Sequence, residues 1–321
     1  MTETARPSSL NISNILHRYG TVAILIALLI VATSMSNVFL TERNIINVLR
    51  QSAGTSLMAV GMLFVILTRG IDLSVGSIAA LGSVLSAILI QDYGTGVSVA
   101  GALCAGAACG LVSGVLIAFL KLPPFVTTLA MMTVARGLSL IVSTGQPIQM
   151  GDAGSLITDF GSGSIGTVPY PVVLMIAVFV ISGVVLVFTR FGRLVKAIGS
   201  NVEAVRLSGI PVAFYTTSVY VISGVLASAA GIVSTSRTGI GSANIGVGAE
   251  LDAIAAVVIG GASLMGGRGG VFNTFIGVIV LGIIANMMNL ARVPGYHQQV
   301  FMGCIIIGAM LLQYASNWFR K

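Results

Sequence analysis

The sequence predicts an all-α membrane protein with about ten transmembrane helices. Charged residues make up 8% of the 321-residue chain, hydrophobic residues make up 56%, and the mean hydropathy is +1.03. A soluble domain carries about 25% charged residues, so nine acidic and sixteen basic side chains cannot cover a soluble surface of this size. Glycine contributes 40 residues, well above its average of about 7%, and small residues let membrane helices pack closely.

Ten apolar segments are candidate membrane spans, because a helix needs about 20 apolar residues to cross the hydrocarbon core. They cover residues 21–36, 52–68, 72–90, 97–120, 124–143, 171–189, 213–235, 251–265, 270–290 and 297–315. The first and eighth are short, so either could be tilted, partial or re-entrant. Residues 1–20 are polar and lack the apolar region of a signal peptide, which predicts a cytoplasmic tail before a single membrane domain over residues 21–321.

The basic residues predict the orientation of these spans. With the N-terminus inside, eleven bases fall on the inner side and four on the outer side, while Arg136 falls within a span. Cytoplasmic loops are enriched in Lys and Arg, so both termini are expected inside. The net charge of +7 then reflects orientation and not nucleic-acid binding. A loop over about 144–170 is expected outside, in the periplasm, and a loop over 190–212 inside, in the cytoplasm.

Small residues recur at helical spacing in one of the predicted spans. Gly106, Gly110 and Gly114 are four residues apart, which predicts a face for close helix contact.

Two other segments suggest an internal repeat. The segments "GIDLSVGSIAALG" and "AELDAIAAVVIGG" each place an aspartate, Asp72 or Asp252, at the mouth of a span that contains glycine. These are the third and eighth spans, which enter from opposite sides, as in an inverted repeat. Their residue identity is low, so the repeat is a hypothesis only.

The sequence contains no complete motif for catalysis or metal binding. None of the three lysines follows a glycine, so a GK[ST] phosphate-binding loop is absent. "GSGSIG" at 161–166 fits GxGxxG but lies in a loop without the strand and helix that dinucleotide binding requires. His17 and His297 lie far apart, and the three cysteines form no CxxC motif or Cys/His cluster. We therefore expect no enzyme active site and no metal site.

The basic segment 189–215 contains a short predicted helix in "NVEAVRLSG". Asn201 is a candidate N-cap, Glu203 lies in the first turn, and Gly209 can adopt the left-handed C-cap, followed by Pro211. A basic loop that anchors to anionic lipid is one interpretation. A capped helix is more structure than lipid attraction requires, so docking to a cytosolic partner is favoured.

Five motifs in order resemble the permease subunits of bacterial ATP-binding-cassette (ABC) monosaccharide importers, the ribose permeases above all. They are "AVGMLFVILTRGIDLSVGS" (59–77), "LPPFVTTLAMMTVARG" (122–137), "GRLVKAIGSNVEAVRLSGI" (192–210), "ELDAIAAVVIGGASLMGGRG" (250–269) and "NMMNL" (286–290). The resemblance covers nearly the whole chain. Val205 replaces an alanine of the usual family pattern, which is a conservative change.

The resemblance implies a homodimer of this chain in the bacterial inner membrane. It also implies a nucleotide-binding subunit with two cassettes, which would hold ATP and Mg, and a periplasmic sugar-binding protein above; this chain itself would carry no cofactor. Segment 196–210 would be the coupling helix. Residues expected to couple to the ATPase are Gly199, Asn201, Glu203, Arg206, Leu207, Ser208 and Gly209.

Several polar residues are candidates for the translocation path or its control. Phe125, Thr127 and Thr128 follow two prolines at a broken helix start, where a cavity could form. Arg136 is expected to form an ion pair or snorkel, with a path contact as the alternative. Asn286 and Asn289 are expected to bond between helices, with sugar contact as the alternative. Asp72, Glu250 and Asp252 are structural or gating candidates, and Asp72 is expected to pair with Arg69 three residues earlier.

Two other classes of protein compete with an ABC permease. One is an ion-coupled secondary transporter that works alone, and the other is a membrane-embedded enzyme. The sequence lacks paired intramembrane acids and Cys/His clusters, which speaks against both. Ribose or a similar pentose is the favoured cargo, but permeases for xylose, hexoses and autoinducer-2 share these motifs.

Overall fold

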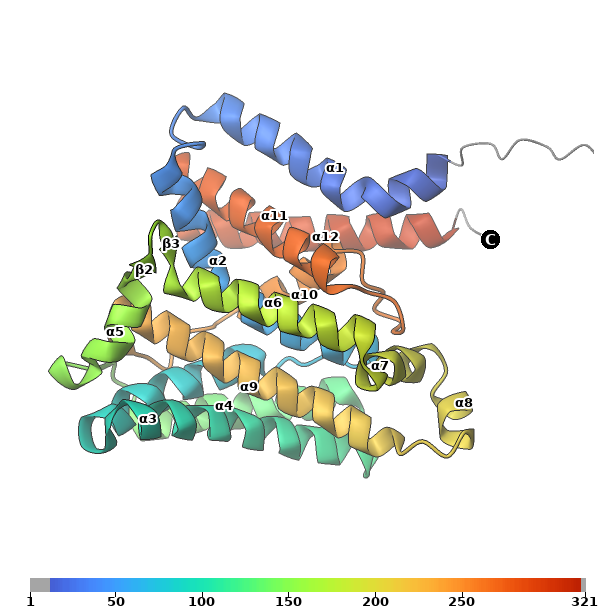
Figure 1. The fold of residues 1–321 in the computed structure, drawn as a ribbon, viewed down its shortest axis with the longest axis horizontal. Coiled ribbons are helices and arrows are strands. Elements are labelled where there is room, and N and C mark those ends of the chain that lie inside the picture. The colour runs from blue at the N-terminus through green and yellow to red at the C-terminus, as the bar shows by residue number, and fades with distance from the viewer. Residues whose placement is uncertain (1–11, 319–321) are drawn as a thin grey trace, which may run out of the picture.

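The protein is a bundle of long helices that run in one general direction (Figure 1). The computed structural model describes residues 12–318. The long helices are α1 (Ile12–Met35), α2 (Glu42–Leu67), α3 (Val75–Ala118), α4 (Pro124–Ser143), α6 (Tyr170–Phe188), α9 (Val212–Thr238), α11 (Val271–Leu290) and α12 (Gly295–Trp318). The shorter helices are α5 (Ser155–Ser162), α7 (Arg190–Ser200), α8 (Val202–Leu207) and α10 (Ala249–Ile259), and Asp152–Gly154 forms one 3₁₀ turn.

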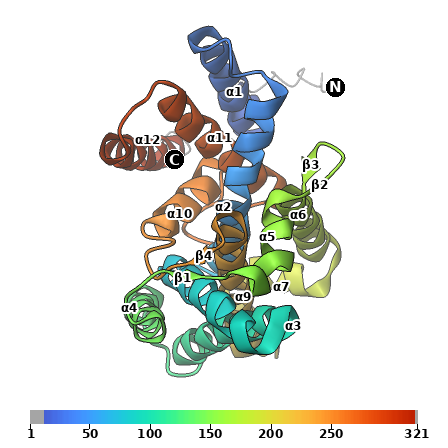
Figure 2. The same ribbon diagram turned by 90° about the vertical axis from the view of Figure 1, so that its left-hand side faces the viewer.

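Within residues 12–318, strands are restricted to two short antiparallel pairs outside the helices. β1 (Ile148–Gln149) pairs with β4 (Ile240–Gly241), and β2 (Ser164–Ile165) pairs with β3 (Val168–Pro169). The first pair ties the long loop after α4 to the segment after α9. The fold is therefore helical, as predicted, with strands only where loops cross one end of the bundle (Figure 2).

Six of the described helices are long and apolar enough to cross a membrane: α2, α3, α4, α6, α9 and α11. α3 has 44 residues, or roughly 66 Å of helix, more than twice the thickness of the hydrocarbon core. It breaks at Gly94, where φ is 74° and ψ is 175°. Ser98 Oγ donates to Ser86 O at 2.7 Å across the break, so the two halves fold back on each other. These halves correspond to the predicted spans 72–90 and 97–120.

The eighth predicted span, 251–265, is only a partial helix. α10 contains eleven residues, about 16 Å, roughly half of the hydrocarbon thickness. Residues 260–270 after it are not helical, and Gly261, Gly266 and Gly267 there all have positive φ. The eighth predicted span is therefore a helix of half the expected length followed by a non-helical segment.

The first predicted span begins earlier than expected. α1 starts at Ile12 and has 24 residues, about 36 Å, which is enough to cross the core. The predicted tail over 1–20 is therefore partly helical, and residues 1–11 lie outside the described residues. Ala32 at the end of α1 and Phe39 beyond it pack with Ile283 of α11, so an apolar cluster holds α1 against the bundle.

The predicted glycine face forms the tight contact between α3 and α9. A Cβ on Gly106 would lie 2.6 Å from Ser228 Cβ, and a Cβ on Gly114 would lie 2.8 Å from Thr217 Cα. Gly110 meets the backbone of Tyr220 in the same way. Relaxed non-bonded carbons lie about 3.5–4.0 Å apart, so any side chain there would push the helices apart. The prediction of a close helix contact is confirmed.

The loops divide between two ends of the bundle. α7 and α8 lie at one end, together with the start of α1 and the end of α12, and α5, β2 and β3 lie at the opposite end (Figure 1). We refer to these as the α8 end and the α5 end. The predicted loops 190–212 and 144–170 therefore lie on opposite sides of the bundle, as the predicted topology requires.

Candidate functional site

The short helix α8 has the local structure that the sequence predicts. The Asn201 side chain accepts a hydrogen bond from Ala204 N at 3.0 Å, which caps the first turn. Arg206 Nη2 lies 2.7 Å from Glu203 Oε1, so the two charges three residues apart do pair. Gly209 has φ of 73° and ends the segment in the left-handed region. These features stabilise the helical conformation of α8 through contacts within the segment itself.

α8 presents an exposed apolar side chain at the end of the molecule. Leu207 is 79% exposed and Val202 is 44% exposed, while Val205 on the other side is buried and holds the helix to the protein. Ser208 Oγ donates to Ala204 O at 2.9 Å and extends the last turn. A fixed helix with an exposed leucine and a pair of charges is a surface suited to another protein.

α7 precedes this helix and was not predicted. Thr189 caps it by accepting from Gly192 N at 3.2 Å, and its buried residues are Gly192, Val195, Ile198 and Gly199. The apolar residues recur three or four apart, which is the signature of an amphipathic helix. That spacing is the feature of the sequence that predicts α7, whereas the basic residues of the segment favour a loop.

Gly199 joins this segment to the membrane helices. A Cβ there would lie 2.5 Å from Gly267 N and would overlap the Leu67 carbonyl oxygen. Leu67 O accepts from Gly267 N at 3.0 Å. Arg69 donates from Nε to Gly199 O at 2.5 Å and from Nη2 to Ser200 O at 2.8 Å. We call these five residues the junction, because here the end of α7 meets the end of α2 and the loop between α10 and α11.

Asp72 does not pair with Arg69, so that expectation is wrong. α2 ends at Leu67, and the residues after it are not helical, so a spacing of three does not bring these side chains together. Asp72 Oδ2 instead accepts from Ser223 Oγ of α9 at 2.7 Å, and Oδ1 accepts from the Ser74 backbone and hydroxyl. The carboxylate is 1% exposed and fastens the start of α3 to α9.

Arg136 binds backbone rather than an acidic side chain. Its Nη1 donates to Ile245 O at 2.9 Å and to Ala243 O, both in the segment between β4 and α10. Glu250 at the start of α10 adds a favourable charge interaction. The expected ion pair of Arg136 is therefore absent from the described residues. The side chain instead binds carbonyl groups, which fixes α4 beside the non-helical segment 242–248.

The residues after the proline pair divide by exposure. Thr127 Oγ1 donates to Pro123 O and Thr128 Oγ1 to Ile71 O, both at 3.1 Å, and both threonines are buried. Phe125 is 55% exposed. The threonines therefore hold the start of α4 against the loop before α3, and the structure does not bring them to a shared cavity with Phe125.

The two asparagines of α11 make the interhelical hydrogen bonds that were expected. Asn286 and Asn44 of α2 exchange amide hydrogen bonds of 2.9 and 3.0 Å, and both are buried. Asn289 Oδ1 accepts from Gln298 Nε2 of α12 at 2.9 Å. These bonds connect α11 to its neighbours on both sides.

A row of polar cavities lies where α2, α9, α10 and α12 meet, and most of its residues were not predicted. Three cavities of about 150, 150 and 490 Å³ adjoin through shared lining residues. Gln51 and Thr55 line the first two, Asp252 lines the second and third, Arg237 lines the first, and Gln298 the third. We call this the polar row. It brings together side chains from distant helices, and only Asp252 among them was a candidate.

The polar row lies on one flank of the bundle. In the view along the helices, α4, α10 and α12 are on one side, and α6 and α7 are on the other (Figure 2). Polar groups at the depth of a bilayer face protein or water and not lipid. A multi-pass bundle with such a polar flank, and with a short exposed helix held at one end, has the architecture of a membrane permease.

Comparison with known proteins identifies the family within this class. The family model described as the branched-chain amino acid transport system / permease component matches residues 44–310, so the chain belongs to this family. It is a multi-pass transport subunit of the bacterial cytoplasmic membrane and not an enzyme. No solved structure matches the chain.

Relatives of known name agree with this family over nearly their whole length. The ribose import permease protein of Escherichia coli is 42% identical over 294 residues, which cover 91% of each chain. That of Bacillus subtilis is 41% identical over 307 residues, which cover 94% of each chain. The L-arabinose ABC transporter permease protein of Azospirillum brasilense is 36% identical over 308 residues, 95% of this chain and 90% of the relative. The resemblance to permeases of ABC monosaccharide importers is thereby confirmed.

Proposed function

We propose that this chain is the membrane subunit of an ATP-driven importer for a monosaccharide, with ribose or a similar pentose as its cargo. The ribose import permeases of Escherichia coli, Bacillus subtilis and Haemophilus influenzae are 42%, 41% and 38% identical, whereas the L-arabinose and D-allose permeases are each 36% identical. The difference favours ribose. The cargo would pass along the polar row, because hydroxyl groups of a sugar need polar partners once they leave water.

The single observation that carries the mechanism is the rigid connection between α8 and the membrane helices. α8 would dock on a separate subunit with two nucleotide-binding cassettes, which holds ATP and Mg. Closure of the cassettes would move α8, and the junction would pass this movement to α2 and to the loop after α10. The close backbone approach at Gly199 leaves little freedom for that movement to be absorbed.

The proposed orientation places the α8 end in the cytoplasm and the α5 end in the periplasm. Basic residues of the segments at the α8 end are Arg69, Arg190, Arg193, Lys196, Arg206 and Arg268, in line with the positive-inside rule. A periplasmic sugar-binding protein would then dock over α5. Both termini would be cytoplasmic.

The ten crossing segments and the inverted repeat are part of the same proposal. Non-helical residues 68–74 precede α3, and residues 242–248 precede α10. Gly76 at the start of α3 packs against the Gly246 carbonyl just before α10, so the two helix starts meet inside the bundle. An inverted repeat produces such a pair of broken helices. α10 and the segment after it together would make the eighth crossing.

A second copy of this chain would close the polar row. The row lies on the surface of one copy, where Gln51 and Leu251 are exposed, and polar groups there would be costly against lipid. Two copies that face each other through α4, α10 and α12 would instead enclose a polar path between them.

Reconstitution tests the function directly. The chain is placed in vesicles with its ATPase and binding protein, and uptake of labelled ribose, arabinose and allose is measured. We expect uptake of ribose that requires ATP, both partners and an intact apolar side chain at Leu207. Leu207→Glu should be inactive, and Leu207→Met, which keeps an apolar side chain of similar size, is the matched control. Uptake by this chain alone, driven by an ion gradient, would show that it is a secondary transporter.

Cysteine labelling tests the orientation. Leu156 on α5 and Val202 on α8 are 66% and 44% exposed, so Leu156→Cys and Val202→Cys can be introduced into a variant from which the three native cysteines have been removed. A reagent that cannot cross membranes should label the first in intact cells and the second only in inverted vesicles. The reverse pattern would contradict the proposed orientation and the docking role of α8.

A further inference from the structure

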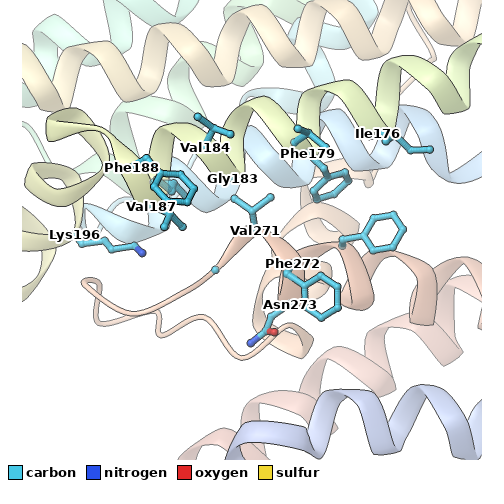
Figure 3. Close-up of a pocket in the computed structure, with 14 residues that line it drawn as sticks. Ile176, Phe179, Gly183, Val184, Val187, Phe188, Lys196, Val271, Phe272 and Asn273 are labelled. Atoms are coloured by element: carbon cyan, nitrogen blue, oxygen red, sulfur yellow. The ribbon is translucent and has the colours of Figure 1, made fainter.

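An apolar groove runs between α6 and α11 (Figure 3). In Figure 2, α6 lies on the opposite side of the bundle from α10 and α12, which line the polar row. Its volume is about 620 Å³, within the range of roughly 300–1,000 Å³ in which proteins enclose organic ligands. Its lining residues are Ile176, Phe179, Val180, Gly183, Val184, Leu186, Val187, Phe188, Lys196, Gly270, Val271, Phe272, Asn273 and Phe275. Twelve of these carry no polar side-chain atom.

The groove has the length and direction of one leaflet of a bilayer. Its lining along α6 extends from Ile176 to Phe188, about 18 Å of helix, and half of a hydrocarbon core is about 15 Å. Phe179 and Phe275 both line the groove and meet edge to face, with ring centroids 5.1 Å apart. At Gly183 a Cβ would have nothing within 4 Å, so the groove is open there.

Polar groups occur only at the mouth, which is at the α8 end. Lys196 of α7 and Asn273 of α11 are the polar side chains of the lining, and no acidic residue is among them. Figure 3 shows the Lys196 amine turned toward the groove. Among the described residues, the one ion pair is between Arg206 and Glu203. Within this part of the chain, the Lys196 amine therefore forms no ion pair with a carboxylate.

We propose that this groove binds an anionic phospholipid of the leaflet at the α8 end. One acyl chain would lie along α6, and the phosphate would be held by the Lys196 ammonium and the Asn273 amide. A single positive group at the mouth of a long apolar groove matches one negative head on a long apolar tail. Basic pockets between membrane helices commonly hold lipid head groups in this way.

The position of Lys196 gives the lipid an influence on transport. Lys196 lies on α7, three residues before Gly199 in the junction. A bound phosphate would hold α7 against the first turn of α11 and so stiffen the segment that carries α8. The protein would then couple ATP hydrolysis to uptake best in a membrane that contains anionic lipid.

Lipid retention tests the proposal. The chain is purified in mild detergent, relipidated with equal amounts of phosphatidylglycerol and phosphatidylcholine, washed, and its bound lipids are counted by native mass spectrometry. We expect retained phosphatidylglycerol, and about fivefold weaker retention in Lys196→Gln, since one lysine near the surface contributes a factor of that order. Arg190→Gln, the same charge loss on α7 outside the groove, should retain lipid as the wild type does.

A second variant separates the tail from the head. Gly183→Leu should fill the groove and abolish retention of both lipids, whereas Gly96→Leu, at an equally open position on α3, should not. Equal retention of the two lipids by wild type and Lys196→Gln would overturn the proposal. A disulfide between two copies that carry Val184→Cys would also overturn it, because a second copy would then occupy the groove.

Discussion

Replacement of Gly199 by alanine is the sharpest test of the junction. The new Cβ would lie 2.5 Å from Gly267 N and 2.9 Å from the Leu67 carbonyl carbon, whereas relaxed contacts are about 3.5 Å or longer. Both neighbours are backbone atoms, so the end of α7 has to move by about 1 Å. That movement breaks the hydrogen bond from Gly267 N to Leu67 O and at least one of the two bonds from Arg69.

The expected cost follows from these bonds. A neutral hydrogen bond contributes about 0.5–1.5 kcal/mol and one from a charged group about 1.5–3 kcal/mol, so the junction should lose about 2–4 kcal/mol. Alanine has a higher helix propensity than glycine by about 1 kcal/mol, which offsets a small part. Because α7 lies outside the membrane spans, the variant should still insert.

The measurements are thermal unfolding in detergent and the number of sugars imported per ATP hydrolysed in vesicles. We expect Gly199→Ala to bind the ATPase through an intact α8 and yet to import at least tenfold less sugar per ATP. Gly96→Ala, on α3, where a Cβ meets nothing within 4 Å, is the control and should behave as the wild type or be slightly more stable. If Gly199→Ala keeps the wild-type ratio and stability, the junction does not transmit movement.

Three further outcomes are expected. Asn286→Leu should lower the free energy of unfolding by about 1–3 kcal/mol, because it leaves the buried Asn44 amide without its partner. The double variant Asn44→Leu with Asn286→Leu should recover part of this loss in thermal unfolding. Strictly additive losses in the double variant would contradict the amide pair. Gly209→Val forces a branched side chain to φ near 73°, at a cost of about 1–2 kcal/mol. The assembled complex should therefore lose substrate-stimulated ATP hydrolysis although the variant inserts normally into the membrane. Unchanged hydrolysis would mean that the conformation at the end of α8 does not matter for coupling. Arg206→Glu places a second acid beside Glu203 and should weaken co-purification of the ATPase. Higher salt should partly restore it, because salt screens the repulsion, and Arg206→Gln should have a milder effect. Equal co-purification by the wild type and both variants would favour a lipid-anchoring loop.

Local patterns in the sequence predicted α8 and the glycine face correctly for a physical reason. An N-cap, a charge pair three residues apart and a left-handed glycine each depend on backbone within one turn. The spacing of Gly106, Gly110 and Gly114 likewise determines that the three residues share a helix face. Which helix meets that face was open until the structure showed α9.

The expected pair of Asp72 and Arg69 shows where local reasoning fails. A spacing of three brings side chains together only on a helix, and the helix ends at Leu67 before either residue. Beyond the helix the backbone is irregular, and each side chain binds a partner far away in the sequence. Asp72 binds Ser223, 151 residues later, and Arg69 binds the carbonyl of Gly199, 130 residues later.

The polar row and the apolar groove were also beyond the sequence. Gln51, Thr55 and Gln298 are ordinary polar residues in apolar segments, and no motif distinguishes them. They form a row of cavities only because α2 and α12 lie on either side of the short helix α10. The groove depends in the same way on how α6, α7 and α11 pack.

By itself, the sequence determined that this is a helical membrane protein, where most of its apolar segments lie, and that α8 is a capped helix. Composition decides the first, because a chain with so few charges has no soluble surface, and local backbone preferences decide the others. Only the tertiary structure showed which groups the buried polar side chains bind, that α10 is about half as long as a membrane span, and that Gly199 contacts the end of α2. These depend on packing between residues far apart in the chain, where the free energy of contacts between segments outweighs what any one segment prefers alone.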